Sequence, residues 1–180
     1  MIRAARPEDA IAIARVHVAS YRATYRGIML DSHLESFSAA TRARVFSEFI
    51  AEGRYPIDVL ELDRIVGFCG YGPARDDDKD PAICCELQAI YLDPSVWRRG
   101  YGAEMTRRVV DWAQRNAFSE VVLWVLERNA PARAFYERLG FTADGATKVL
   151  EDGDWRAIEA RYRIDSAPRA AVPRGSNDER

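Results

Sequence analysis

One stretch of the chain constrains the fold more than any other: a strand, a turn, a helix and a second strand follow one another between Ala82 and Glu127. The apolar run "AICCELQAIYLD" predicts a long strand, "EVVLWVLE" predicts a buried one, and a helix ending at about Asn116 separates them. Two strands of one sheet that are joined through a helix run parallel, because the crossover returns the chain to the same end of the sheet. We therefore expect a parallel strand pair within the sheet.

Hairpins on both sides of this unit add antiparallel pairs. Alternating apolar residues predict one hairpin in residues 57–74, with its turn at Asp63-Arg64, and another in residues 141–164 around "DGD". Residues 2–5 read as a short first strand. Helices are predicted in "RPEDAIAIARVHVASYRATY", in residues 41–52 and in "NAPARAFYERLG", and the loop after the first can hold a short helix. The expected fold is α/β (α+β): a mixed, mostly antiparallel central sheet of about seven strands, with helices on both faces.

The chain length and charge narrow the class of protein. The 180 residues are enough for one domain with a core, which we place at 1–165, and too few for two. Residues 166–180 have almost no large apolar side chains and are predicted to be a disordered tail. A formal net charge of −2 gives no general attraction for nucleic acid or membrane surfaces. Without a membrane-length apolar run or a signal peptide, the expected location is cytoplasmic.

The cysteines and histidines give no support for a metal or redox site. Cys69, Cys84 and Cys85 lack the spacing of such motifs, and their odd number argues against a disulfide framework. Neighbouring strand residues point to opposite faces, so Cys84 and Cys85 are expected to be small core or interface residues. His17 and His33 lie far apart, and His17 shares an apolar helix face that predicts packing. No metal cofactor is expected.

An anion site is predicted where the long strand gives way to its helix, in "VWRRGYGAEM". Gly100 and Gly102 open this helix, whose first amides have no internal partners and carry the positive end of the dipole. Glycine lets the backbone approach an anion closely, and Arg98 and Arg99 add charge that can pair with phosphate. No Gly-Lys-Ser/Thr of a nucleotide P-loop follows, and Met105 stands where a dinucleotide fingerprint has a small residue. A loop that uses glycine merely to turn is the alternative.

Two segments at the right separation make the chain similar to the GNAT superfamily of N-acetyltransferases. "ELQAIYLDPSVWRRGYGAEM" resembles the central strand, loop and pyrophosphate-binding turn of that family, and "LWVLERNAPARAFYERLGF" resembles its next strand and helix. The likeness runs from Ile2 to about Ile164. Trp97 departs from the pattern, because the family usually has Gln or Arg three places before the first motif glycine. The resemblance implies acetyl-CoA-dependent transfer of an acetyl group to a primary amine, directly and within a ternary complex.

The same resemblance assigns the acetyl-CoA site, with acetyl-CoA as cosubstrate and no metal. The pyrophosphate would lie in the glycine turn, and the pantetheine arm along the main chain of residues 90–92. An amide near Ile90 or Tyr91 would polarise the thioester carbonyl. Asn129 fits the cap of a helix as well as a pantetheine contact, and both roles stay open. The residues implied in cosubstrate binding are Ile90, Tyr91, Leu92, Arg98, Arg99, Gly100, Tyr101, Gly102, Ala103, Asn129, Arg133 and Tyr136.

Tyr136 and Glu86 are the implied catalytic residues. A phenol near the sulfur can protonate the leaving thiolate, although the apolar stripe on which Tyr136 falls is also typical of core. Glu86 lies within the central strand, where burial would raise the pKa of its carboxyl and suit it to accept a proton from the amine. An ion pair with an arginine explains Glu86 equally well. Glu127 is the reserve candidate for the base, and some family members use ordered water.

The acceptor side is less specified. By resemblance, residues 25–34 and 149–155 would line it, and the acceptor would be a small-molecule or peptide amine, with no nucleic acid or membrane partner. Glu151, Asp152 and Asp154 can attract a cationic amine, but a solvated hairpin turn is the preferred explanation. Homodimers are common in the family. A non-catalytic acyl-CoA sensor or interaction module on the same fold is the alternative function, and an unrelated nucleotide-binding protein is a further one. Aromatic residues that would shape a pocket, or simply pack, are Tyr21, Tyr25 and Trp155.

Overall fold

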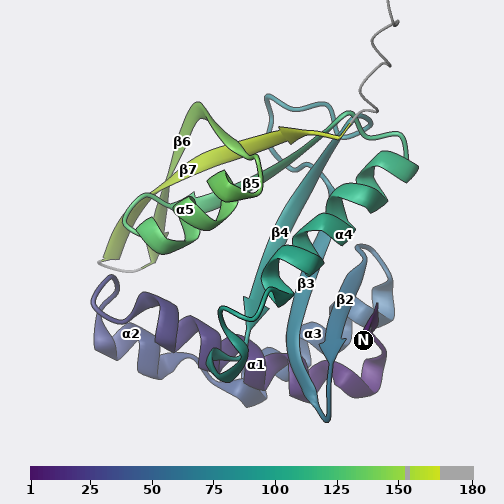
Figure 1. Cartoon of the computed structure of the whole chain (residues 1–180). Coiled ribbons are helices and arrows are strands. Elements are labelled where there is room, and N and C mark those ends of the chain that lie inside the picture. The colour runs from purple at the N-terminus through teal and green to yellow at the C-terminus, as the bar shows by residue number, and fades with distance from the viewer. Residues whose placement is uncertain (153–154, 167–180) are drawn as a thin grey trace, which may run out of the picture.

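The strands form one seven-stranded sheet in the order β1-β2-β3-β4-β5-β7-β6, drawn in Figure 1. The computed structural model describes residues 1–152 and 155–166. The elements in chain order are β1 (Ile2–Ala4), η1 (Pro7–Asp9), α1 (Ala10–Tyr25), α2 (Asp31–Ser36), α3 (Ala39–Glu52), β2 (Ile57–Glu61), β3 (Ile65–Pro73), β4 (Cys84–Leu92), η2 (Pro94–Val96), α4 (Tyr101–Arg115), β5 (Glu120–Leu126), α5 (Ala130–Arg138), β6 (Thr142–Asp152) and β7 (Trp155–Asp165).

The pairing of β4 with β5 is parallel, and the other five pairs of neighbouring strands are antiparallel. The parallel register is short, because only Cys84–Glu86 lie opposite Glu120–Val122. β5 stays paired with β7 along its whole length. Within the described residues, β4 from Leu87 to Leu92 therefore has no strand on the side that faces β5, and the two strands open into a wedge. The mixed, mostly antiparallel sheet confirms the predicted fold class.

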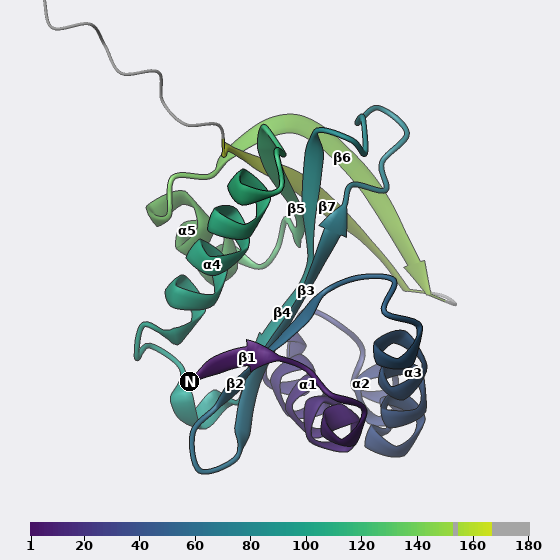
Figure 2. The ribbon, with the colours of Figure 1, turned by 90° about the vertical axis from the view of Figure 1, so that its right-hand side faces the viewer.

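Helices cover both faces of the sheet, as Figure 2 shows. α1 and α3 pack on one face, where Ile13 and Val16 contact Val59 and Phe68. α4 and α5 lie on the other face, and their apolar stripes join the largest core cluster. This cluster includes Met105, Val109, Ala113, Val121, Leu123, Tyr136, Phe141 and Tyr162.

A bulge in β4 changes which side chains face which helices. Gly70 pairs with Ala89 and Tyr71 pairs with Leu87, so Gln88 is the extra residue. Before the bulge, Cys85 and Leu87 belong to the α4 side of the core, and after it Ile90 and Leu92 do. Cys84 instead packs with Ala74 and Val122, which confirms that Cys84 and Cys85 point to opposite faces.

The predicted elements are confirmed, with small shifts at their ends. The loop after the first helix holds α2, and the third helix starts two residues earlier than predicted, at Ala39. Ser166 is buried and donates its hydroxyl to the Phe118 carbonyl at 2.7 Å. The rest of the predicted tail, residues 167–180, lies outside the described residues, as do Gly153, Asp154 and the side chains of Asp152 and Trp155.

His17 is packed within α1, as the sequence predicted, and it has an unusual environment. Its Nδ1 has no hydrogen-bond partner in the described part of the chain. Burial, and to a smaller extent the charge of Arg42, lowers the pKa of His17 to about 4. The rings packed around the imidazole are those of Tyr21, Phe37, Phe46, Phe68 and Tyr91.

We predict that His17 makes the fold sensitive to mild acid. Unfolded chains bind a proton at His17 below pH 6.5, whereas the folded protein excludes it down to about pH 4. The contribution of neutral His17 to the free energy of unfolding is fully present above pH 6.5 and decreases as the pH falls towards 4. At pH 5 the free energy of unfolding is lower by about 2 kcal/mol. Urea unfolding of the wild type and of His17→Leu at pH 7.5 and pH 5 measures this decrease in the free energy of unfolding. The wild type should lose about 2 kcal/mol more than the variant, and equal losses would exclude His17 as the cause.

Candidate active site

The open edge of β4 presents main-chain groups to the wedge. The Asp93 amide donates to the Val66 carbonyl of β3 at 2.8 Å. Because successive residues of a strand direct their amides to opposite sides, the Tyr91 amide also turns towards β3, and the amides of Ile90 and Leu92 turn into the wedge. Of the two amides that the sequence offered for the thioester carbonyl, the geometry favours that of Ile90.

The turn between β4 and α4 has two residues in the left-handed region. Arg98 has φ 61° and Gly100 has φ 87°, with Arg99 between them. A left-handed conformation is uncommon for a residue other than glycine, and it clusters at sites that bind ligands. Alternation of conformations in such a turn makes successive amides converge on one concave surface, which suits an anion. The geometry thus adds a second feature to the helix terminus that the sequence predicted.

The two glycines of the turn are required for different reasons. A Cβ placed on Gly100 would meet nothing within 4 Å, so the positive φ and the bare approach to its backbone call for glycine there. A Cβ on Gly102 would lie 3.3 Å from both Leu92 and Phe135, so Gly102 allows α4 to pack closely on β4 and α5. Of the two glycines, Gly100 is therefore the one whose backbone is open to a ligand, and its contact with an anion stays a prediction.

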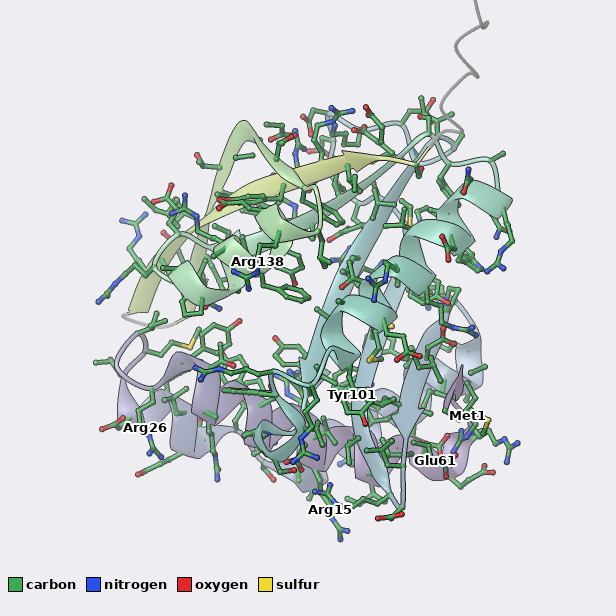
Figure 3. All side chains as sticks on the ribbon, in the orientation of Figure 1. Met1, Arg15, Arg26, Glu61, Tyr101 and Arg138 are labelled. Atoms are coloured by element: carbon green, nitrogen blue, oxygen red, sulfur yellow. The ribbon has the colours of Figure 1, made fainter. Side chains whose placement is uncertain are left out.

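Some side chains of the turn are exposed to solvent, and others pack against the core. Arg98 and Arg99 are exposed, and within the described residues neither has an ion-pair partner, which leaves both free to meet phosphate. Tyr101, labelled in Figure 3 at the start of α4, is half-buried and packs against the core, and Ala103 is half-buried in the same turn. Trp97 donates its indole N–H to the Leu92 carbonyl at 2.7 Å. The residue that departs from the family pattern thus ties the turn to the end of β4.

Asn129 and Arg133 position α5 beside the wedge. Asn129 is buried, and its Oδ1 accepts from the Ala132 amide at 3.2 Å, so the predicted cap of α5 is confirmed. Arg133 donates from Nε to the Tyr162 hydroxyl at 3.0 Å and from Nη1 to the Glu127 carbonyl at 3.3 Å. These contacts give both residues a structural role, and their contact with acetyl-CoA stays a prediction.

Three tyrosines from different elements come together near the wedge: Tyr25 at the end of α1, Tyr91 on β4 and Tyr136 on α5. Tyr25 and Tyr91 lie close enough for each to affect the pKa of the other. Burial, and after it the neighbouring Tyr25, raises the pKa of Tyr136. A phenol with a raised pKa stays protonated at neutral pH and can donate a hydrogen bond. The sequence suggested Tyr25 only as a pocket or packing residue, since nothing local reveals its contact with Tyr91.

Glu86 is buried on β4, and an arginine holds its carboxylate. Arg75 donates from Nε to Oε2 at 2.8 Å and from Nη2 to Oε1 at 2.6 Å. This ion pair is the alternative that the sequence left open for Glu86. Both oxygens already accept hydrogen bonds, so few lone pairs are left for the proton of an amine. Glu127, the reserve candidate, is exposed at the end of β5.

A buried arginine on β7 organises the same face of the sheet, and the sequence analysis missed it. Arg161 is only 5% exposed and donates to three carboxylates, those of Asp76, Asp78 and Asp144. Asp76 also accepts from the indole N–H of Trp124 at 3.0 Å. The network fastens the loop between β3 and β4 across β5 and β7. Alternation along "WRAIEARYRI" predicts that Arg161 and Glu159 share one face of the sheet. It does not reveal which loop covers them.

Glu159 is a further carboxylate beside the tyrosines that the sequence analysis did not identify. It lies opposite Leu126 on β7 and pairs with Lys148 at 3.5 Å. Its charge helps to raise the pKa of Tyr25, after the larger effect of burial, so the two side chains are near neighbours. Lys148 stacks over the ring of Trp124 at 4.1 Å. This group forms a charged and aromatic wall on the side of the sheet opposite α4.

The structure has an open cleft of about 870 Å³ on the side of the predicted acceptor site. It lies between residues 26–31, which run from the end of α1 to the first residue of α2, and the arginines Arg128 and Arg156. It coincides with part of the region that the resemblance gave to the acceptor, residues 25–34 and 149–155. Arg128 was not foreseen, because the sequence places it at the end of a strand with no sign that it faces the loop after α1.

Residues 1–152 and 155–166, which the structure describes, offer neither a metal site nor a membrane-spanning helix. No group of three or more His, Cys, Asp or Glu side chains there is placed to hold a metal ion. In the same residues, no helix has both the length and the apolar character needed to cross a bilayer.

Sequence comparison finds relatives across most of the chain. The model of the acetyltransferase (GNAT) family matches residues 19–141. The chain is 30% identical over 151 residues to the uncharacterized N-acetyltransferase YuaI of Bacillus subtilis (strain 168), and the match covers 84% of this chain and 82% of that protein.

Solved structures share the fold. PaiA N-acetyltransferase of Thermoplasma acidophilum, in complex with coenzyme A, superposes with a TM-score of 0.71 at 20% identity and covers 92% of this chain and 98% of its own. YncA of Salmonella typhimurium, solved with acetyl-CoA, has a TM-score of 0.69 at 21% identity and covers 95% of this chain and 96% of its own. At these identities the likeness concerns the fold.

Proposed function

This chain belongs to the acetyltransferase (GNAT) family, and on that premise we propose that it transfers the acetyl group of acetyl-CoA directly to a primary amine, with both substrates in the wedge between β4 and β5. One observation carries the proposal. The unpaired edge of β4 leads straight into a turn with two left-handed residues, at the positive end of α4. A strand edge suits an extended amide-containing arm, and the turn suits a diphosphate.

The residues of the wedge fit acetyl-CoA, which supplies a thioester when bound. The amides of residues 99–103 would hold its diphosphate, with Arg98 and Arg99 pairing with the outer oxygens. Leu92 and Ile90 would bond the pantetheine arm as a neighbouring strand does, and the Ile90 amide would polarise the thioester carbonyl. Asn129 and Arg133 would close the site from the end of α5.

Tyr136 is proposed as the general acid. Its side chain is buried and its hydroxyl keeps its proton at neutral pH, so the hydroxyl can donate a hydrogen bond to the departing thiolate or protonate it. Tyr25 and Tyr91 lie near it, and the three phenols would surround the reacting atoms. For the proton that the amine loses, the candidates are Glu86, Glu127, Glu159 and ordered water.

Glu86→Gln separates catalysis from structure. If Glu86 is the base, the rate should fall about 100-fold, with the largest deficit at low pH where the free amine is scarce. Rates of thiol release with a saturating amine between pH 6 and pH 9 measure this. Glu120→Gln is the matched control, because Glu120 is paired with Lys79 and Arg163 at the closed end of β5. An unchanged pH profile of Glu86→Gln, with a loss of stability like that of the control, would make Glu86 a structural residue.

The function itself is tested by thiol release from acetyl-CoA with a panel of primary amines. Amine-dependent release, with acetylated product found by mass spectrometry, is the expected result. Tight binding of acetyl-CoA without release by any amine would favour the acyl-CoA sensor. Saturable binding of ATP or NAD without competition from coenzyme A would favour the unrelated nucleotide-binding protein. A cytoplasmic location and a homodimer stay predictions from the sequence.

A further inference from the structure

The cleft beside the wedge is lined by cations from three distant segments. Arg26 follows the last residue of α1, Arg128 follows β5, and Arg156 lies near the start of β7. Among the described residues that line it, Asp31 is the one carboxylate. Figure 3 shows Arg26 at the α2 end of α1, whereas Arg15 lies elsewhere on the same helix.

These cations are available to a ligand. The side chains of Arg26, Arg128 and Arg156 are all exposed. Arg156 pairs with Glu151, but among the side chains that the structure describes, those of residues 1–151 and 156–166, neither Arg26 nor Arg128 has an ion-pair or hydrogen-bond partner for its guanidinium. Most other arginines around this face are neutralised, including Arg75 and Arg161. Two unpaired guanidinium groups at one cleft favour an anion.

The cleft also adjoins the proposed reaction centre. Arg26 is next to Tyr25, and Arg128 is next to Asn129, which caps α5. The floor includes Met29, which packs in one apolar cluster with Leu126 at the end of β5. A molecule whose amine lies in the wedge can therefore extend into the cleft.

From this arrangement we propose that the acceptor is an amine that also carries an acidic group, a carboxylate or a phosphate, and that Arg26 and Arg128 bind this group. The inference rests on the proposed acetyl transfer and adds the substrate class to it. A guanidinium fork matches a planar carboxylate or a phosphate face, and binding at this point holds the amine at a fixed distance from the thioester.

Matched pairs of amines test the proposal. L-leucine against L-leucinamide tests a carboxylate, and O-phosphoethanolamine against ethanolamine tests a phosphate, each by kcat/KM for thiol release. We expect the acidic member of at least one pair to be preferred by about tenfold or more. The carboxamide and the alcohol lack the acidic group, and kcat/KM is calculated on the concentration of unprotonated amine because loss of that group also changes the pKa of the amine. Equal values within both pairs would overturn the proposal.

Variants locate the contact. Arg26→Gln and Arg128→Gln should each raise KM for the preferred acidic amine about tenfold, and leave KM for acetyl-CoA and for the uncharged partner within about twofold. Arg15→Gln, an exposed arginine of α1 outside the cleft, is the matched control and should change neither. Equal KM values in the Arg26, Arg128 and Arg15 variants would contradict the assignment.

The failure of this inference can be told from the failure of the proposed function. Release of thiol by uncharged amines alone would keep the acetyltransferase and overturn the acidic acceptor. If no amine releases thiol, calorimetric titration with L-leucine and O-phosphoethanolamine decides the site alone. Heat with the wild type that Arg26→Gln abolishes would support the anion site without the transfer, and no heat with either probe would overturn it.

Discussion

A Gly100→Val variant is expected to bind acetyl-CoA at least about 100-fold more weakly than the wild type while staying folded. Gly100 has φ 87°, a conformation that valine reaches only with strain, and the turn must change to relieve it. The change would disperse the amides that converge on the diphosphate, and the new side chain would stand where the anion approaches. Because a Cβ at this position meets nothing within 4 Å, the core is not disturbed. Calorimetric titration with acetyl-CoA and a thermal melt provide the two readouts.

Gly53→Val is the matched control for this experiment. Gly53 ends α3 with φ 60°, and a Cβ there also meets nothing within 4 Å, but α3 lies on the other face of the sheet. Its valine variant should lose a similar amount of stability and bind acetyl-CoA as the wild type does. Unaltered binding by Gly100→Val, or equal weakening by both variants, would contradict the phosphate role of the turn.

Tyr136→Phe is expected to lower kcat about 100-fold and to change KM for acetyl-CoA little. The phenylalanine ring keeps the packing against Phe135 and Phe141 and removes only the hydroxyl that would protonate the thiolate. Because burial raises the pKa of Tyr136, its ionisation should cause no fall in the wild-type rate up to about pH 10. Steady-state rates of thiol release from pH 7 to pH 10 measure both effects.

Tyr71→Phe serves as the control for the loss of a buried hydroxyl. Tyr71 is buried on β3 and donates to Asp58 at 3.0 Å, on the α4 side and away from the acceptor cleft. Tyr71→Phe should lower the free energy of unfolding and leave kcat unchanged. A kcat of Tyr136→Phe within a factor of about two of the wild type would remove Tyr136 as the acid.

The sequence could predict the parts of the fold that depend on residues close together in the chain. Apolar alternation and turn residues gave the strands, and the helix between two apolar runs gave the parallel pair. The opposite faces of Cys84 and Cys85 and the cap at Asn129 depend on neighbours within a few residues. The role of Gly100 in the turn could be predicted because a turn with a positive φ usually requires glycine at that position.

The parts that could not be predicted depend on contacts between distant segments. Arg75 reaches Glu86 across the turn between β3 and β4, and Arg161 reaches Asp78 across 83 positions of the chain. No pattern around either arginine identifies its partner, since one arginine resembles another in a sequence with 26 lysines and arginines. The bulge at Gln88 is equally silent, because Ala89, Ile90, Tyr91 and Leu92 are all apolar, and a continuous apolar run does not show which residues change face. The grouping of Arg26 with Arg128 follows only from the sheet that brings α1 and β5 together.

The central claim is that the turn after β4 and the open edge of β4 hold acetyl-CoA. The most direct test is a crystal structure of the wild type grown with coenzyme A. Density for the diphosphate within hydrogen-bond distance of the amides of residues 99–103, with the arm along Ile90 and Leu92, is the predicted result. Coenzyme A bound at any other surface, with these amides contacted by water alone, would contradict the account.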